Sequence, residues 1–159
     1  ISTRDWSSDV CSSDLVPAGA PRPALATEDD VRQAFASAPS VAWSDSASGT
    51  YIQNELLSRL GVAQAVKDKG RQIPATPVGE ILARHEAAFG CQQRSELQPV
   101  PGIDIVGDLP DSLQRTTPYA AAVVAASTHM AQARAFIQFM AGPASRPIIS
   151  ATGLEPASP

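Results

Sequence analysis

The chain has 159 residues, of which 43% are apolar and 18% are charged, so its composition favours a packed globular protein over a disordered one. Its formal net charge of −4 argues against nucleic-acid binding, which needs a basic surface. The longest apolar stretch, Pro118 to Ser127, is too short to span a membrane. The two cysteines, Cys11 and Cys91, lack the spacing of a metal site or a disulfide framework, so no metal or cofactor is expected.

The first fifteen residues look foreign to the rest of the chain. The segment DWSSDVCSSDL, from Asp5 to Leu15, resembles the in-frame translation of a common sequencing-adapter oligonucleotide. Such a segment has not been selected to pack, so we expect residues 1–15 to be non-native and to lie outside the fold. The alternative is a natural Ser-rich disordered leader. On the adapter interpretation the native N-terminus is missing, and the lack of a signal peptide says nothing about the compartment.

Residues 16–60 predict a linker, a helix, a strand and a second helix. Three prolines make 16–26 a linker, and Thr27 caps a short helix that ends near Ala38. The run SVAWS predicts a buried strand that leads into the Ser-rich turn SDSASG. Ser48 or a neighbour then caps a helix to Leu60, whose apolar stripe consists of Ile52, Leu56, Leu57 and Leu60.

Residues 61–116 continue this alternation. A short helix ends at Gly70 and an extended segment runs through Ile73. Thr76 and Pro77 form the N-cap and first position of the next helix. The runs AAFGCQQ and GIDIVGDLP predict two further strands.

Residues 117–159 predict one strand and two helices. The strand is PYAAAVVAAS, and an amphipathic helix covers Met130 to Met140. A last helix opens at Gly142 and Pro143, ends near Ala151, and is kinked at Pro147.

Strands that alternate with helices predict an α/β protein with a mostly parallel sheet, in which ligands bind beyond the carboxyl ends of the strands. One such place is formed by Gln92 and Gln93, after AAFGC. The other is the turn after SVAWS, where the hydroxyls of Ser44, Ser46, Ser48 and Thr50 lie beside a helix start that favours anions. The alternative is that one serine caps the helix and the others are solvated turn residues. The helix start at Thr76 to Val78 is a second candidate with the same alternative.

Catalysis is not expected from these residues. DSASG departs from the GxSxG nucleophile motif, and no histidine follows at a telling position. His85 continues an apolar helix face and is expected to be a partly buried structural residue. Cys91 lies in an apolar strand and is expected to be a core residue. We therefore predict that the protein is not an enzyme.

Four segments together resemble the periplasmic substrate-binding proteins of molybdate-type ABC importers. They are the turn with SGTY, the helix opening PVGEIL, the segment GCQQRSEL and the closing GPAS…ATGLEP, and the resemblance covers about Pro23 to Pro156. It implies a type II periplasmic-binding-protein (Venus-flytrap) fold. Residues 16–38 would be a linker and helix, and residues 39–116 a complete second, ligand-binding lobe. Residues 117–159 would return to the first lobe and expose an apolar patch for lack of partners.

The resemblance also implies a function without catalysis, in which a small oxyanion such as molybdate is held between two lobes. Ser48 and Val78 match family positions that donate backbone N–H groups. The implied ligand-binding set is Ser46, Ser48, Gly49, Thr50, Val78, Gln92 and Gln93. Gln93 departs from the family pattern because molybdate binders commonly have a tyrosine there.

The implied partners are the ligand and the permease of an ABC importer, and the implied location is the periplasm. The alternative is the ligand-sensing effector domain of a transcriptional regulator, which shares this lobe architecture.

Overall fold

The computed structural model describes residues 5–8, 12–115 and 117–156. The chain divides into two compact units, a larger one from Val10 to Arg115 and a smaller one formed by Ile1–Asp9 and Thr116–Pro159. The two units are described separately below.

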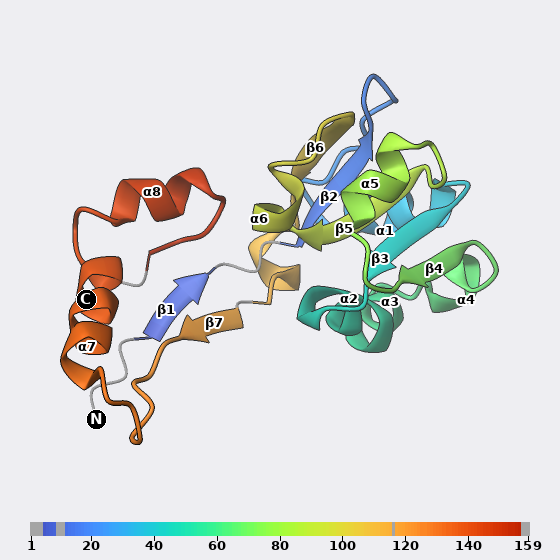
Figure 1. Cartoon of the computed structure of the whole chain (residues 1–159). Coiled ribbons are helices and arrows are strands. Elements are labelled where there is room, and N and C mark those ends of the chain that lie inside the picture. Colours follow the sequence, from blue (N-terminus) through green and yellow to red (C-terminus); the bar gives the residue numbers. More distant parts are fainter. Residues whose placement is uncertain (1–4, 9–11, 116, 157–159) are drawn as a thin grey trace. The chain divides into compact units, whose positions relative to one another are not determined.

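A five-stranded sheet forms the centre of the larger unit (Figure 1). Its strands are β2 (Ser12–Pro17), β3 (Val41–Ser44), β4 (Gly70–Ile73), β5 (Phe89–Gln93) and β6 (Ile103–Asp108). They are arranged in the order β4-β3-β5-β2-β6. β3 is parallel to both β4 and β5, whereas β2 is antiparallel to β5 and β6. The sheet is thus mixed, where the sequence predicted a mostly parallel one.

Strand β2 is the main departure from the predicted elements. Residues 1–15 were expected to lie outside the fold and 16–26 to form a linker, but Ser12–Pro17 is the strand between β5 and β6. Leu15 and Val16 are almost completely buried, on opposite faces of the sheet. Two adjacent apolar side chains therefore anchor this strand in both halves of the core.

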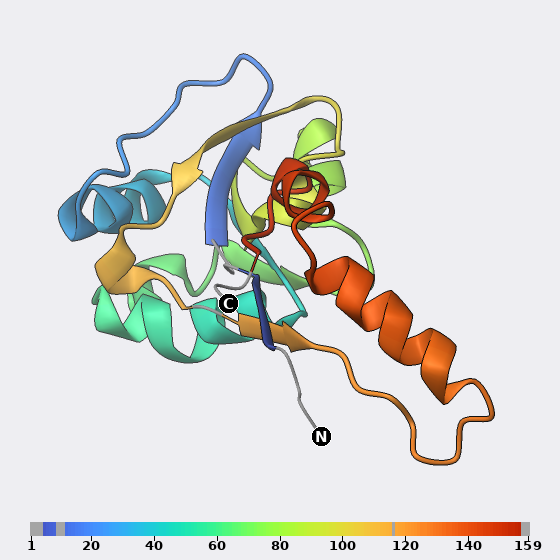
Figure 2. The ribbon, with the colours of Figure 1, turned by 90° about the vertical axis from the view of Figure 1, so that its left-hand side faces the viewer.

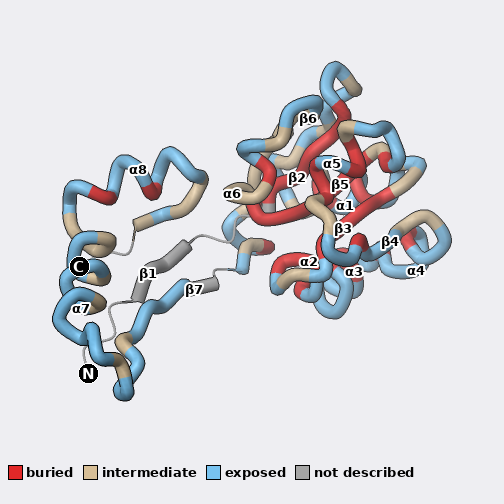
Figure 3. The backbone as a smooth tube through the Cα atoms, in the orientation of Figure 1, coloured by how far each residue is buried: buried red, intermediate tan, exposed pale blue. Residues whose placement is uncertain are grey.

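Helices cover both faces of the sheet, with α5 in front of the strands and α1 behind them in Figure 1. The face behind the strands in that view carries α1 (Glu28–Ser37), α2 (Ala47–Tyr51), η1 (Ile52–Leu56), α3 (Leu57–Arg59) and α4 (Ala63–Val66). The opposite face carries α5 (Val78–Ala83) and α6 (Arg94–Leu97), and a short 3₁₀ turn, η2 (Asp111–Leu113), follows β6. Two apolar clusters fill the space between these layers, and the central strands β3 and β5 and residues 13–17 of β2 are buried along their length (Figure 3).

Most local predictions for the larger unit are confirmed. Thr27 caps α1 in a reciprocal box, because its hydroxyl accepts from the Asp30 N–H at 3.1 Å while Asp30 accepts from the Thr27 N–H at 2.9 Å. α2, the π-helical η1 and α3 follow one another from Ala47 to Arg59, with Ser46 as the N-cap. The N-cap of α5 is Pro77 rather than Thr76.

The smaller unit pairs β1 (Asp5–Ser8) with β7 (Thr117–Ala120) in antiparallel register. A long loop leads from β7 to α7 (Met130–Ala141), and α8 (Arg146–Ala151) follows (Figure 2). The predicted strand from Pro118 to Ser127 is wrong beyond Ala120, because the alanine-rich part is a loop. The predicted kink at Pro147 is also wrong, since proline near a helix start removes no intrahelical hydrogen bond.

Large apolar side chains lie exposed in the smaller unit. Phe136 is 64% exposed and Phe139 57% exposed, and no residue of α7 is buried (Figure 3). Exposed rings of this size on one helix form an apolar surface, as expected from the unpartnered helices of the sequence analysis.

Asp14 is an ionisable residue inside the core of the larger unit. It is fully buried, and apart from an interaction with the Cys91 thiol its carboxylate oxygens have no hydrogen-bond partner. Burial raises the pKa of Asp14 to about 7, while the Cys91 thiol lowers it and the charge of Asp108 raises it further.

We expect Asp14→Val to stabilise the larger unit above pH 5. The folded pKa of Asp14, about 7, exceeds the unfolded value of 3.8, so the wild-type free energy of unfolding is highest below pH 4 and falls until about pH 7. Between these two pH values the contribution of Asp14 lowers the free energy of unfolding by about 4 kcal/mol. Asp14→Val has no carboxyl group and therefore does not lose this stability. Urea unfolding at pH 5 and pH 8 measures the difference. Asp68→Asn, at an exposed carboxylate, is the control, and parallel pH dependence of Asp14→Val and wild type would contradict the assignment.

The start of α2 lies directly against the end of β3. A Cβ atom on Gly49 would lie 1.7 Å from the backbone oxygen of Ser44 and 2.5 Å from its carbonyl carbon. Only a residue without a side chain fits there, so Gly49 sets how closely the helix approaches the strand.

We expect Gly49→Ala to lower the free energy of unfolding by about 2 kcal/mol or more, because backbone must move to admit one methyl group. The matched control is Gly107→Ala, whose added Cβ would make only an ordinary contact of 3.7 Å with Leu25. Thermal unfolding of both variants tests this, and equal melting temperatures would refute the close approach.

Candidate functional site

The candidate site lies at the carboxyl ends of β3 and β5. These strands are parallel, and Trp43 pairs with Cys91, so the next residues, Ser44 and Gln92, follow each other in register. Ala42 belongs to the apolar cluster below α5, so Ser44, two residues on, belongs to the same face of the sheet. Gln92 belongs to this face as well, because its side chain bonds to α5. The predicted edge of the sheet is therefore where these polar side chains meet.

Three serine hydroxyls form a triangle at this edge. Ser44 Oγ lies 2.7 Å from Ser46 Oγ and 3.3 Å from Ser48 Oγ, and the last two oxygens are 3.1 Å apart. Ser44 and Ser48 are each only 3% exposed. Each hydroxyl can rotate its proton toward a neighbour or toward a ligand, so the triangle is a neutral cluster of donors.

The triangle adjoins the start of α2. The Ser46 side chain makes no capping bond, and the bond from the Thr50 N–H to the Ser46 carbonyl, at 2.9 Å, is the first in the helix. The backbone N–H groups of Ala47, Ser48 and Gly49 precede that bond and have no carbonyl one turn back. Thr50 itself is exposed, whereas Gly49 is buried.

Val78 was predicted to offer a backbone N–H to a ligand. In the structure this N–H donates to Gln92 Oε1 at 2.6 Å, and the Gln92 Nε2 donates to Glu96 Oε2. Val78 is completely buried and Gln92 is 5% exposed. A glutamine from the neighbouring strand therefore caps α5, and this explains how Pro77 can occupy the N-cap without a side-chain bond.

Gln93 and the residues after it complete the edge. Gln93 is 5% exposed, and its Nε2 donates to Ser95 Oγ at 2.9 Å. Arg94 forms an ion pair with Asp108 at 2.7 Å, and Ser13 Oγ donates to the other oxygen of Asp108. Gln92 and Gln93, adjacent in sequence, thus have different partners.

Glu96 and Arg94 were not among the predicted site residues. Both follow β5 directly, so the rule that ligands bind beyond strand ends covers them as well as the glutamines. His85, expected to be partly buried, is instead exposed, with φ +57°, just after α5. Within residues 5–8, 12–115 and 117–156, no group of three or more His, Cys, Asp or Glu side chains could hold a metal ion.

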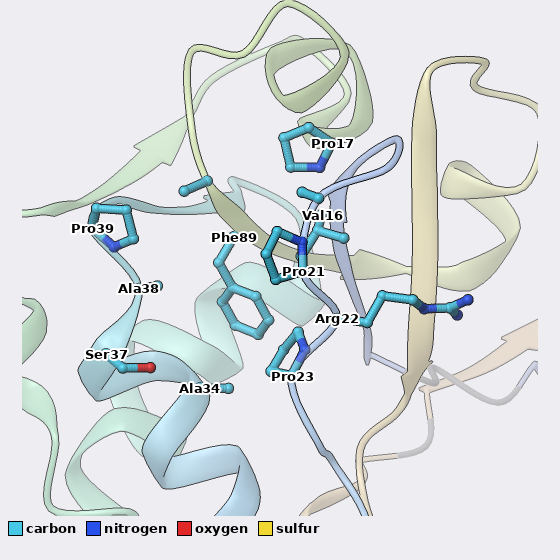
Figure 4. Close-up of a pocket in the computed structure, with 12 residues that line it drawn as sticks. Val16, Pro17, Pro21, Arg22, Pro23, Ala34, Ser37, Ala38, Pro39 and Phe89 are labelled. Atoms are coloured by element: carbon cyan, nitrogen blue, oxygen red, sulfur yellow. The ribbon is translucent and has the colours of Figure 1, made fainter.

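An apolar pocket of about 470 Å³ lies at the other end of the strands (Figure 4). Its lining includes Pro39 and Phe89, which precede or begin β3 and β5, so it is remote from the serine triangle. Pro21 and Pro23 face the Phe89 ring, whereas Arg22 extends away from it (Figure 4). The guanidinium of Arg22 donates instead to the Ile105 carbonyl at 2.6 Å. The pocket therefore lacks convergent polar groups and is not the candidate site.

Comparison with known proteins gives a family match, a related sequence and similar solved structures. The family model of the bacterial extracellular solute-binding protein matches residues 4–155. An aconitate isomerase from Pseudomonas sp is 46% identical over 138 residues, which are 87% of this chain and 53% of that protein. The chain thus spans about half the length of this relative.

Two solved structures have the same fold. The substrate-binding domain of a putative molybdenum ABC transporter from Clostridium difficile has a TM-score of 0.70 and 19% identity, covering 96% of this chain and 67% of that one. The periplasmic molybdate-binding protein of Azotobacter vinelandii has a TM-score of 0.64 and 20% identity, covering 99% and 68%. These two similarities confirm the predicted α/β fold of the periplasmic binding proteins. No helix in the described part of the chain has the length and apolar character needed to cross a membrane.

The prediction that the protein is not an enzyme is contradicted by the similarity to aconitate isomerase. The prediction relied on serine, histidine and cysteine motifs, and an isomerase that moves a proton needs none of them.

The match over residues 4–155 and the shared fold give one conclusion: this chain belongs to the bacterial extracellular solute-binding protein family.

Proposed function

We propose that this chain provides one wall of a binding site for a small polycarboxylate of the aconitate type, and that it takes part in aconitate isomerisation. The observation that carries the proposal is the triangle of Ser44, Ser46 and Ser48 at the start of α2. The 46% identity to an aconitate isomerase supports the choice of substrate.

A carboxylate suits this set of donors. Its two oxygens accept several hydrogen bonds, and bonds to an ionised acceptor are stronger than bonds between neutral groups. Ser44 and Ser48 are buried, so their hydroxyls would face the ligand in a water-poor setting. The backbone N–H groups at the start of α2 add donors of the same kind.

A tetrahedral oxyanion such as molybdate, the ligand implied by the family resemblance, is the rival. Such an anion is fully ionised and needs donors on several sides. The N–H of Val78 is already bonded to Gln92 Oε1, and the Glu96 carboxylate lies behind that amide. Acceptor atoms on this side favour a ligand with an uncharged carbon segment over a compact dianion.

The extracellular family supports a periplasmic location and weighs against the effector domain of a transcriptional regulator. Delivery of the ligand to an ABC permease remains part of the proposal as a second use of the same site. The protein would then bind a tricarboxylate for transport, isomerise it, or do both.

We expect wild-type chain to bind trans-aconitate in isothermal titration, and Ser48→Ala to weaken binding about tenfold, as loss of one hydrogen bond to a charged group implies. The control is Ser58→Ala, on an exposed part of α3. Molybdate is titrated in parallel, and proton NMR follows conversion of cis- to trans-aconitate. Binding of molybdate without binding of either aconitate isomer would overturn the proposal in favour of the rival.

A further inference from the structure

We propose that Glu96 is the carboxylate that transfers the proton during isomerisation, and that Gln92 is the positioning residue that holds it. This inference rests on the proposed function and assigns a catalytic group to the same site.

The Gln92 amide fixes where Glu96 lies. The Val78 N–H can only donate, so it requires the oxygen end of the amide, 2.6 Å away. The NH₂ end must then point toward Glu96, whose Oε2 accepts from it. Because Gln92 is 5% exposed and bonded at both ends, its side chain has one orientation. The amide therefore holds one oxygen of Glu96 and leaves the other available.

Glu96 differs from the other carboxylates at this edge of the sheet. Asp108 is paired with Arg94 at 2.7 Å and also accepts from Ser13 Oγ, so both of its oxygens are engaged. Asp45 accepts from the Ala75 N–H at 3.2 Å and so is bonded to the loop before α5. Among the described residues no Arg, Lys or His nitrogen lies within 4.0 Å of Glu96, and its bond is to a neutral amide. Glu96 is thus the carboxylate at this edge that is held by a neutral amide and has no cation beside it.

The position of Glu96 fits a ligand held by the serines. Ser44 and Gln92 lie on neighbouring strands and on the same face of the sheet, about 4.8 Å apart along the hydrogen-bonding direction. A tricarboxylate anchored by one carboxylate at the triangle extends over that distance. Its methylene group would then lie beside the Gln92 amide, to which Glu96 is bonded.

The step is balanced without a further reactant. Glu96 takes a proton from the methylene carbon of aconitate, the C–H bond breaks, and its electron pair spreads over the allylic system into the adjoining carboxylate. The double bond then forms at the former methylene carbon. Glu96 returns the proton to the former vinyl carbon, and the new geometry at the double bond gives the other isomer. Nothing is oxidised or reduced, and the proton count is unchanged.

The test compares binding with turnover in the full 159-residue chain. Titration with trans-aconitate gives the affinity, and NMR in D₂O gives both the isomerisation rate and deuterium uptake at the methylene carbon. We expect Glu96→Gln to bind within about threefold of wild type but to isomerise and exchange at least about 100-fold more slowly. Glu96→Asp should recover part of the rate, because it restores a carboxylate. Gln92→Met, of similar size, should lower kcat more than it changes affinity.

The matched control is Glu80→Gln, an exposed glutamate on α5 that pairs with Arg84 and should leave both readouts unchanged. Circular dichroism checks that each variant is folded. Wild-type turnover and exchange in Glu96→Gln would overturn the role of Glu96 and leave the proposed function standing. A loss of binding as large as that of Ser48→Ala would make Glu96 a binding group and also overturn the role. Absence of both binding and isomerisation in wild type would overturn the proposed function and this inference together.

Discussion

The parallel pairing of β3 with β5 is the constraint on which the site depends. It aligns Trp43 with Cys91, so Ser44 and Gln92 leave the sheet side by side and on one face. Everything described at the site follows from that register. Ser44 meets the two serines of the α2 start, and Gln92 meets α5 and Glu96. A shift of one strand by one residue would turn that strand's side chain to the opposite face and separate Ser44 from Gln92.

Much of this could be predicted from the sequence because it is local. The capping box at Thr27, the apolar stripe from Ile52 to Leu60 and the strand SVAWS each depend on residues within a few positions of one another. The Ser-rich turn was predicted as a site for the same reason, since a helix start and its neighbouring hydroxyls are adjacent in the chain. Strand-end logic then indicated Gln92 and Gln93 without any knowledge of their partners.

What could not be predicted depends on contacts between distant segments. The bond from Val78 to Gln92 joins residues fourteen positions apart and gives an internal partner to an N–H that a local pattern marks as free. β2 was missed because its partners in β5 and β6 lie 75 to 95 residues further along the chain. Its pattern of Ser, Asp, Leu and Val has no strand periodicity, and only Leu15 and Val16 have an evident place in the core. The burial of Asp14 could not be predicted for the same reason. Aspartate is usually exposed, but β2 pairs with a strand on each side, and this pairing buries the residue.

The chain can resemble both binding proteins and an isomerase without contradiction, because fold and reaction depend on different residues. A solute-binding site needs donors that hold the ligand, and in the proposed site the serine triangle is this set of donors whether or not a reaction follows. Catalysis needs in addition a group whose interaction strengthens as the ligand reacts. A carboxylate held by an amide, with no cation beside it, has this property toward a carbon-bound proton. A carboxylate has little attraction for a ligand that is already an anion, so Glu96 would not contribute to binding in a protein that only holds an anion. On the proposed assignment, the step from receptor to enzyme in this fold needs only one glutamate after β5 and the glutamine that orients it.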